Sequence, residues 1–318
     1  MILSKEVWPW VTKFEADIYQ ARQNWPKISI VTPSYNQALY LEETILSVIN
    51  QHYPNIEFII IDGGSTDHSV DIIKKYERHL AYWMSEKDKG QADAITKGLK
   101  ICTGEIFNWI NSDDLLAEKA LLTLAETYLK NQHIKIIAGG CTHFVDTRED
   151  IETTFVKDLS FEGLISEKSH FQQPAQWIIT NKVKNLSIDT NLDYSFDWGM
   201  ILNIELQKKE VRYLHQNLAY FREHVHAKTA TNALAFKYEK LDIVKKYYKN
   251  TSNLRKKLIL FQYIFRLKNY LKVVAKIEKG KKNKFLDFFV FGIKSPSLFL
   301  IKFYLGHLKN LLNGKENH

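Results

Sequence analysis

Cysteine is scarce in this chain of 318 residues, which contains only Cys102 and Cys141. Neither cysteine belongs to a CxxC pair, so the sequence gives no support for a structural zinc site, and we expect reduced thiols. No uninterrupted apolar run reaches the roughly 18 residues of a membrane-spanning helix, which argues against such a helix. Residues 1–17 also lack a long apolar stretch, so we expect no secretory signal and a cytoplasmic protein.

The charge of the chain is unevenly distributed. Apolar residues make up 45% of the sequence and charged residues 25%, which is typical of globular proteins, and the length predicts about two structural units. The net charge is +8, but residues 1–235 carry −7 and residues 236–318 carry +15. We therefore divide the chain into an N-terminal extension (1–26), a catalytic body (27–231) and a basic amphipathic helical region (232–318).

Hydrophobic periodicity predicts alternating strands and helices in the body. The strands are expected at 28–32, 57–61, 80–84, 106–110 and 134–138, and the helices at 39–51, 67–76, 91–100 and 117–130. This order indicates an α/β fold with a mainly parallel, Rossmann-like sheet flanked by helices. Further helices are expected at 200–209 and, with Lys alternating with apolar residues, at 236–280.

Polar segments follow four of the predicted strands. They span Thr32–Asn36, Asp62–Asp67, Asp88–Asp93 and Asn111–Asp114. Ligands of open α/β sheets bind outside the carboxyl ends of the strands, so these segments define a candidate site. Taken alone, each segment is also typical of a turn or a helix cap. The chain has neither the Gly-Lys-Ser/Thr of a phosphate-binding loop nor a GxGxxG fingerprint, which excludes those two kinds of nucleotide site.

Four stretches in this order resemble glycosyltransferase family 2. They read TPSYNQALYLEETILSVINQHYPNIEFIIIDGGSTDHSVDIIKKY, DKGQADAITKG, TGEIFNWINSDD and QQPAQW. The resemblance runs from about Lys27 to about Thr231 and is strongest in its first part. It implies the GT-A fold and an inverting enzyme that uses a nucleotide-diphosphate sugar.

The resemblance also implies a donor site. Pro33, Ser34 and Tyr35 match the loop that holds the nucleotide base and ribose. Asp62 matches the first acid of an Asp-Asp-Gly-Ser turn, but Gly63 replaces the second acid, which contacts the base in some members. Asp62 could take over that contact, so the nucleotide stays open among UDP, which we favour, GDP and dTDP. The full set implied to bind the nucleotide sugar is Pro33, Ser34, Tyr35, Asp62, Lys89, Gln91, Asp93, Lys97 and Asp113.

A metal site is implied by Ser112-Asp113-Asp114, which matches the family's DxD-type motif with Ser112 in the first position. Carboxylates are the ligands that Mg²⁺ and Mn²⁺ prefer, and such an ion bridges a diphosphate well. Asp114 is then the best metal ligand, and Asp113 faces the ribose or completes the metal shell. His224, in a late Arg-Glu-His element, is a further candidate ligand, although a lone histidine is often structural.

The resemblance assigns the catalytic base to Asp197, in the segment SFDWG. The match is imperfect, because Gly199 stands where the usual pattern has another acid. We therefore predict an inverting, metal-dependent glycosyltransferase of bacterial surface polysaccharide or lipid-linked glycan synthesis. One alternative is a sugar-phosphate nucleotidyltransferase, whose Gly-rich loop with Thr-Arg is missing here. The other is a non-enzymatic nucleic-acid-binding protein, for which no known motif is present, so we expect no nucleic-acid partner.

The basic C-terminal region has two interpretations. Its helices could pack on the catalytic body, or they could meet an anionic membrane, because basic amphipathic helices with Phe, Tyr and Leu suit the membrane interface. Lysines at 279–284 precede an apolar cluster at Phe285–Phe291, and a further amphipathic helix is expected from Ser295. We favour the second interpretation and predict peripheral association with the cytoplasmic face of the inner membrane.

Overall fold

The computed structural model describes residues 8–9, 11, 16–131, 133–145, 150–183, 186–225, 227–228 and 232–279. The chain divides into two compact units, one ending at Val225 and one beginning at His226. The change in composition placed the boundary at Thr231. The helix predicted from Ser295 and the apolar cluster at Phe285–Phe291 lie outside the described residues.

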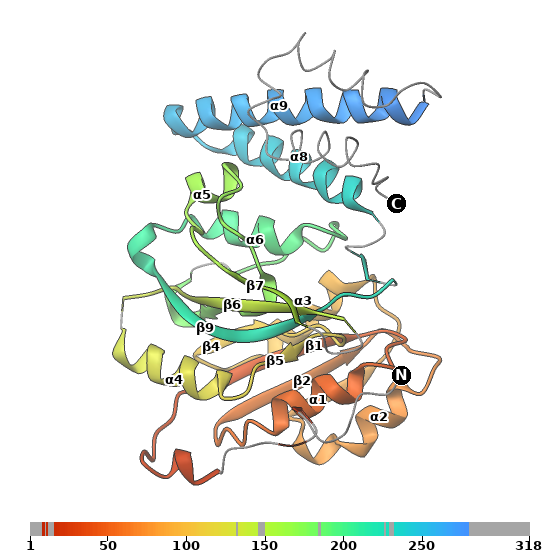
Figure 1. Cartoon of the computed structure of the whole chain (residues 1–318), viewed down its shortest axis with the longest axis vertical. Helices are drawn as coiled ribbons and strands as arrows, with labels where there is room; N and C mark the ends of the chain where they lie inside the picture. Colours follow the sequence, from red (N-terminus) through yellow and green to blue (C-terminus); the bar gives the residue numbers. More distant parts are fainter. Residues whose placement is uncertain are drawn as a thin grey trace. The chain divides into compact units, whose positions relative to one another are not determined.

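Strands and helices alternate through the first part of unit one, as their hydrophobic periods predict (Figure 1). The strands are β1 (Ile28–Ser34), β2 (Ile56–Asp62), β3 (Tyr82–Ser85), β4 (Ile106–Trp109), β5 (Leu115–Leu116), β6 (Ile136–Phe144), β7 (Asp150–Phe155), β8 (Gln176–Ile179) and β9 (Val211–Arg222). The α-helices are α1 (Leu41–Ile49), α2 (Ser69–Lys75), α3 (Gln91–Ile101), α4 (Ala120–Lys130), α5 (Phe161–Ile165) and α6 (Phe196–Ile204).

These strands form one sheet in the order β3-β2-β1-β4-β8-β6-β9-β5, with β7 paired to β6. The first four strands of this order are all parallel. Beyond β4 the sheet is mixed, because β8 is antiparallel to both β4 and β6 while β9 is parallel to β6. The predicted α/β fold is confirmed, and the parallel part of the sheet is its first half.

Successive side chains of β1 point to opposite faces of the sheet and contribute to the core on both faces. Ile28 and Ile30 are fully buried in the main hydrophobic cluster with residues of α1, α2 and α4, whereas Val31 points to the opposite face. Figure 1 shows α1 and α2 on one side of the strands and α3 on the other. On that second side a Cβ atom at Gly98 of α3 would lie 2.6 Å from the methyl groups of Val31. This glycine therefore sets how closely α3 approaches the sheet.

The described part of the N-terminal extension is built into the core of unit one. The ring of Tyr19 meets Trp25 and Tyr53 edge to face, with centroids 5.5 Å apart in both pairs. Trp25 Nε1 donates a hydrogen bond to the Tyr19 carbonyl, and the Tyr53 hydroxyl donates one to the carbonyl of Pro26. These contacts join residues 16–26 to the loop between α1 and β2.

The helix expected at 200–209 was placed too late in the sequence. In the structure α6 begins at Phe196 and ends at Ile204, because Glu205 adopts a left-handed backbone with φ of 54°. A short 3-10 helix at Lys208–Glu210 follows, and β9 begins at Val211. The shift matters for the site, because it places Asp197 in the first turn of α6.

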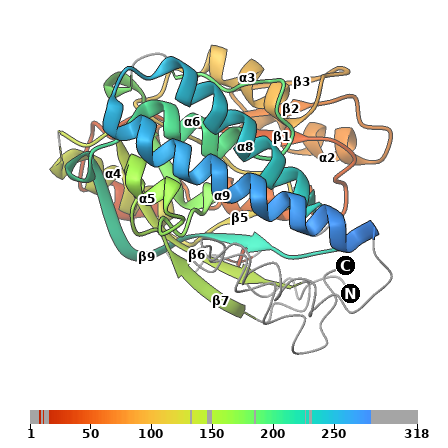
Figure 2. The same cartoon turned by 90° about the horizontal axis from the view of Figure 1, so that it is seen from above.

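Unit two contains two long helices in its described part, α8 (Ala233–Asn250) and α9 (Leu254–Lys279). They lie side by side in Figures 1 and 2, and Leu241 and Val244 of α8 are buried together with Leu260 and Leu267 of α9. The helical prediction for 236–280 is confirmed, with a break between the two helices. Among the described residues, no helix is long and apolar enough to cross a membrane.

Candidate active site

The carboxyl ends of β3, β2, β1 and β4 lie at one edge of the sheet because these strands run parallel. Asp62 pairs with Ser34 on β1 and with Ser85 on β3, so the loops that follow these strands start side by side. The strand order reverses between β1 and β4, and open α/β sheets bind ligands at such a reversal. The predicted polar segments therefore do meet at one place.

The first loop of the site is held by the turn after β2. Asn36 takes a left-handed backbone with φ of 52°, and its side-chain oxygen accepts a hydrogen bond from the Thr66 amide. Asp67 accepts hydrogen bonds from the amides of Ala38 and Ser69, which ties the loop to the start of α2. Beside these contacts Pro33 and Ser34 are buried, whereas Tyr35 is 60% exposed. The exposed ring is thus presented from a rigid loop.

Asp62 is fully buried, and its carboxylate holds the turn that follows it. One oxygen accepts hydrogen bonds from the amides of Gly64 and Ser65 and from the Ser85 hydroxyl, and the other accepts one from the Ser65 hydroxyl. The carboxylate of Asp62, which the sequence suggested as a contact for the nucleotide base, therefore already accepts hydrogen bonds from four protein donors.

The start of α3 brings Lys89, Gln91, Asp93 and Lys97 to the same edge. Gln91 donates a hydrogen bond to the side chain of Asn111, which links α3 to the loop after β4. Lys97 lies 3.4 Å from Glu86 and 3.6 Å from Asp93, so two carboxylates balance its charge. Lys89 is exposed and has no ion pair among the described residues, which leaves it the more available of the two cations.

Asp113 and His224 come together from sequence positions 111 residues apart. Asp113 Oδ2 lies 3.0 Å from His224 Nε2, and the Asp113 side chain is 22% exposed. The ring of Tyr40 packs against the imidazole with centroids 4.7 Å apart and so fixes its orientation. A carboxylate oxygen and an imidazole nitrogen are donors that Mn²⁺ accepts, and Mg²⁺ accepts the carboxylate.

The neighbouring Asp114 is enclosed by protein. It is 1% exposed, and its carboxylate accepts hydrogen bonds from the Arg222 amide and the side-chain amide of Asn111. Burial raises the pKa of Asp114 well above its ordinary value, and the negative charge of Asp113 raises it further. The two adjacent acids thus differ in access, and Asp113 is the one that a ligand can reach.

Arg222, at the end of β9, binds both acids and is itself buried. Its Nε donates a hydrogen bond to the Asp113 carbonyl, and one terminal nitrogen lies 2.5 Å from Glu43 of α1. The guanidinium also lies 4.8 Å from the ring centre of Tyr40 and 4.6 Å from that of Phe144. A charge taken out of water in this way needs such partners, so Arg222 fixes the loop of Asp113 against α1 and β9.

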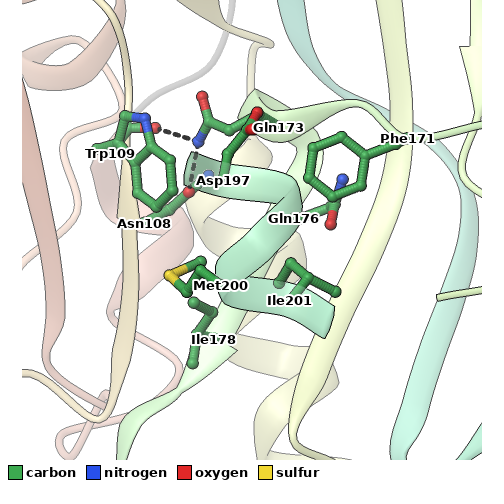
Figure 3. Close-up of a pocket in the computed structure, with 9 residues that line it drawn as sticks. All are labelled: Asn108, Trp109, Phe171, Gln173, Gln176, Ile178, Asp197, Met200 and Ile201. Carbon is green, nitrogen blue, oxygen red and sulfur yellow. Dashed lines mark hydrogen bonds between the residues drawn. The ribbon is translucent and has the colours of Figure 1, made fainter. Parts of the chain in front are cut away.

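Asp197 lines a small cavity beside the end of β4 (Figure 3). The cavity has a volume of about 10 Å³, roughly the space of one water molecule. The Gln173 amide reaches across it and donates hydrogen bonds to Asn108 and to the carbonyl of Trp109. Asp197 is half-buried, and its Oδ1 accepts a hydrogen bond from the next amide, at Trp198. The full lining is Asn108, Trp109, Phe171, Gln173, Gln176, Ile178, Asp197, Met200 and Ile201.

The protein side chains near Asp113 supply only part of the ligand shell that a divalent cation needs. Among the described residues no group of three His, Cys, Asp or Glu side chains could hold a metal ion. Two protein ligands, Asp113 and His224, would therefore need oxygens from a diphosphate or from water to complete the shell. Such a partial protein shell is usual where Mg²⁺ is held together with substrate phosphates.

Sequence reasoning gave no role to several residues that build the site. Arg222 was noted only as part of the Arg-Glu-His element, although an arginine between an aromatic strand and a candidate ligand is a usable signal. Glu43 and Tyr40 look like ordinary helix residues in the sequence. Gln173 belongs to the QQPAQW stretch that carries the resemblance, but only the structure shows what it contacts.

Comparison with known proteins identifies the class of enzyme to which this site belongs. The model of the glycosyl transferase family 2 matches residues 29–192, and the chain belongs to this family. An uncharacterized glycosyltransferase of Haemophilus influenzae is 29% identical over 243 residues, which cover 71% of this chain and 94% of that protein. The predicted family and glycosyltransferase class are confirmed.

Two solved structures show the same fold. S. aureus TarS 1–349 in complex with UDP-GlcNAc aligns with a TM-score of 0.64 at 14% identity and covers 92% of this chain and 93% of its own. The mannosyltransferase of Pyrobaculum calidifontis in complex with GDP-Man and Mn²⁺ gives 0.56 at 16% identity, with 95% and 93% covered. These likenesses confirm the predicted GT-A fold.

Replacing Arg222 with Met should lower the free energy of unfolding by about 3–5 kcal/mol, because the buried carboxylate of Glu43 would lose its ion pair with the guanidinium. Urea denaturation followed by circular dichroism measures this loss. Lys75→Met is the matched control. It breaks an ion pair with Glu42 in which the lysine side chain is 61% exposed, and it should lower the free energy of unfolding by no more than about 1 kcal/mol. Equal losses in the two variants would contradict the role of Arg222.

Proposed function

We propose that this chain is an inverting, metal-dependent glycosyltransferase that moves a sugar from a nucleotide-diphosphate sugar to an acceptor hydroxyl. The observation that carries the proposal is the arrangement around the end of β4. Asp113 faces His224 just after this strand, and Asp197 lines a cavity with Asn108 and Trp109 at the end of the same strand. A metal-binding pair and a separate carboxylate are the two parts that this reaction needs.

Asp113 and His224 would hold Mg²⁺ or Mn²⁺, with the enclosed Asp114 supporting the loop from behind. This assignment exchanges the two acids relative to the sequence analysis, because Asp114 is buried and hydrogen-bonded while Asp113 is accessible. When bound, the ion neutralises the charge that develops on the leaving diphosphate. The Mn²⁺ complex of the similar mannosyltransferase supports the choice of metal.

The donor would lie along the strand ends, with Pro33, Ser34 and Tyr35 beside its nucleoside. Lys89 is the cation that we assign to a phosphate, because Lys97 is already paired with two carboxylates. UDP-GlcNAc in TarS and GDP-Man in the mannosyltransferase support a nucleotide-sugar donor. We favour a UDP-sugar.

Asp197 would act as the general base. It takes the proton from the acceptor hydroxyl while that oxygen attacks the anomeric carbon on the side opposite the leaving diphosphate. One displacement with one base inverts the configuration, unlike retaining glycosidases, which need two carboxylates and two steps. The first turn of α6 holds this carboxylate, because its Oδ1 accepts the Trp198 amide.

Asp197→Asn should lower the rate of sugar transfer by about 10²–10⁴-fold, because the amide cannot accept the acceptor's proton. Donor affinity, measured by calorimetry, should stay within about twofold, since a one-atom change removes no donor contact. The transfer assay follows nucleoside diphosphate, and pyrophosphate in its place would indicate a nucleotidyltransferase. Asp242→Asn, at an exposed acid of α8, is the control. Full transfer activity in the Asp197 variant would contradict the assignment of Asp197 as the general base.

Asp113→Ala and His224→Ala should each remove the gain in UDP affinity that Mn²⁺ provides, because each deletes a proposed ligand. Asp114→Asn should keep that gain, since this side chain is enclosed and reaches no ligand. Titration of UDP with and without Mn²⁺ measures the difference for all three variants. The opposite order, with the metal effect lost only in Asp114→Asn, would restore Asp114 as the ligand.

We also propose that unit two meets an anionic membrane, which would place the enzyme at the cytoplasmic face of the inner membrane beside a glycan or lipid-linked acceptor. Leu254, Leu258, Phe261 and Phe265 are between 52% and 81% exposed and form one stripe along α9. The helix carries eight Lys or Arg residues and one acid, Glu278. Apolar side chains flanked by cations are typical of helices that lie in the membrane interface.

Leu258→Glu combined with Phe261→Glu should abolish flotation of the protein with vesicles that contain anionic phosphatidylglycerol, because both changes bury charge in the interface. The control Asn253→Glu with Gln262→Glu adds the same charge at exposed polar positions of the same helical region and should weaken flotation less. Unchanged flotation of the first variant would contradict the role of the stripe.

A further inference from the structure

The carboxylate of Asp88 occupies the space beside Gly63, at the edge of the site where β2 and β3 end. A Cβ atom added to Gly63 would lie 2.8 Å from Asp88 Oδ2 and 3.0 Å from its Cγ. The backbone of Gly63 does not take the left-handed conformation that favours glycine, unlike Gly64 and Gly90. Room for the Asp88 side chain, rather than backbone geometry, is therefore what the glycine provides.

Asp88 keeps much of its hydrogen-bonding capacity. Its Oδ1 accepts a hydrogen bond from the Gly90 amide at 2.8 Å, and no other donor to this carboxylate is found among the described residues. Asp62, which precedes Gly63 at the end of β2, by contrast already accepts hydrogen bonds from four protein donors. Of the two acids at this end of the site, Asp88 is the one that can accept a hydrogen bond from a ligand.

The position of Asp88 matches the nucleoside end of the proposed donor. Asp113 follows β4, and Gly63 follows β2 on the other side of β1, so the two points are separated by two strand spacings, roughly 10 Å. A nucleoside diphosphate that places its diphosphate at Asp113 extends across β1 toward Gly63. Tyr35 follows β1, the strand between these two points, and its exposed ring is available to cover the nucleoside.

We propose that Asp88 is the residue that selects the base of the donor by accepting a hydrogen bond from a ring N–H group. Uracil and guanine carry such a group, whereas cytosine and adenine present an unprotonated ring nitrogen at the corresponding edge, which a carboxylate repels. This inference rests on the proposed function and deepens it. It also replaces the suggestion that Asp62 takes over the contact with the base.

Calorimetric titration of the full chain with UDP, GDP, CDP and ADP in the presence of Mn²⁺ tests the proposal. The unmodified protein should bind UDP or GDP at least about tenfold more tightly than CDP and ADP, since a hydrogen bond to a charged group is among the stronger ones. Asp88→Gly should lose this preference, with its affinity for inorganic pyrophosphate unchanged. Asp71→Asn removes the same charge from an exposed position of α2 and should change neither value.

The exchange of the two residues makes the test specific. Asp88→Gly vacates the space beside Gly63, and Gly63→Asp can then place a carboxylate in that space from the neighbouring strand end. The double variant should regain the preference for UDP or GDP. Gly63→Asp alone should weaken binding of every nucleotide, because its side chain would collide with Asp88.

Two results would overturn the assignment. An unchanged base preference in Asp88→Gly would show that another group reads the base, and an equal loss for UDP, CDP and pyrophosphate would show that Asp88 only shapes the loop before α3. Failure of the unmodified protein to bind any nucleoside diphosphate would instead overturn the proposed function, and the assignment with it. The three outcomes are distinguished by the same set of titrations.

Discussion

The buried guanidinium of Arg222 is the constraint on which the geometry of the site depends. An arginine that is 2% exposed must be paired and hydrogen-bonded, and the chain supplies Glu43, the Asp113 carbonyl and two aromatic rings for this purpose. These partners come from α1, from the loop after β4 and from β6. Satisfying one charge therefore fixes three segments together, and it places His224 two residues further along, against Asp113.

The sequence placed the candidate site at one edge of the sheet, but it contains no information on how exposed each of the two adjacent acids is. Parallel strands bring their carboxyl ends to one edge, so the segments after β1, β2, β3 and β4 could be grouped from periodicity alone. Whether Asp113 or Asp114 faces a ligand depends on a contact with β9, 108 residues away in the sequence. No local pattern contains that information, because the spacing of the two acids is compatible with either orientation.

The end of α6 and the space beside Gly63 could not be predicted from the sequence for a related reason. The expected helix extended to Lys209, but the left-handed Glu205 ends α6 at Ile204, and β9 begins at Val211. At Gly63 the sequence shows only that a side chain is missing. The structure shows that Asp88, from the next strand end, fills the space. Both features are set by tertiary packing, which overrides local preference.

The distribution of charge supports the proposed metal. Residues 1–235 carry a net charge of −7, and Asp113 stands where the anionic diphosphate would lie, with Asp88 and Asp93 along the same edge of the candidate site. Lys97 contributes little field because two carboxylates balance it, and the other lysines of this loop, Lys87 and Lys89, are exposed. Exposed lysines in high-dielectric surroundings offset nearby carboxylates only weakly. A divalent cation at Asp113 would reverse the sign of the local charge, and binding of the proposed donor would then depend on binding of the metal.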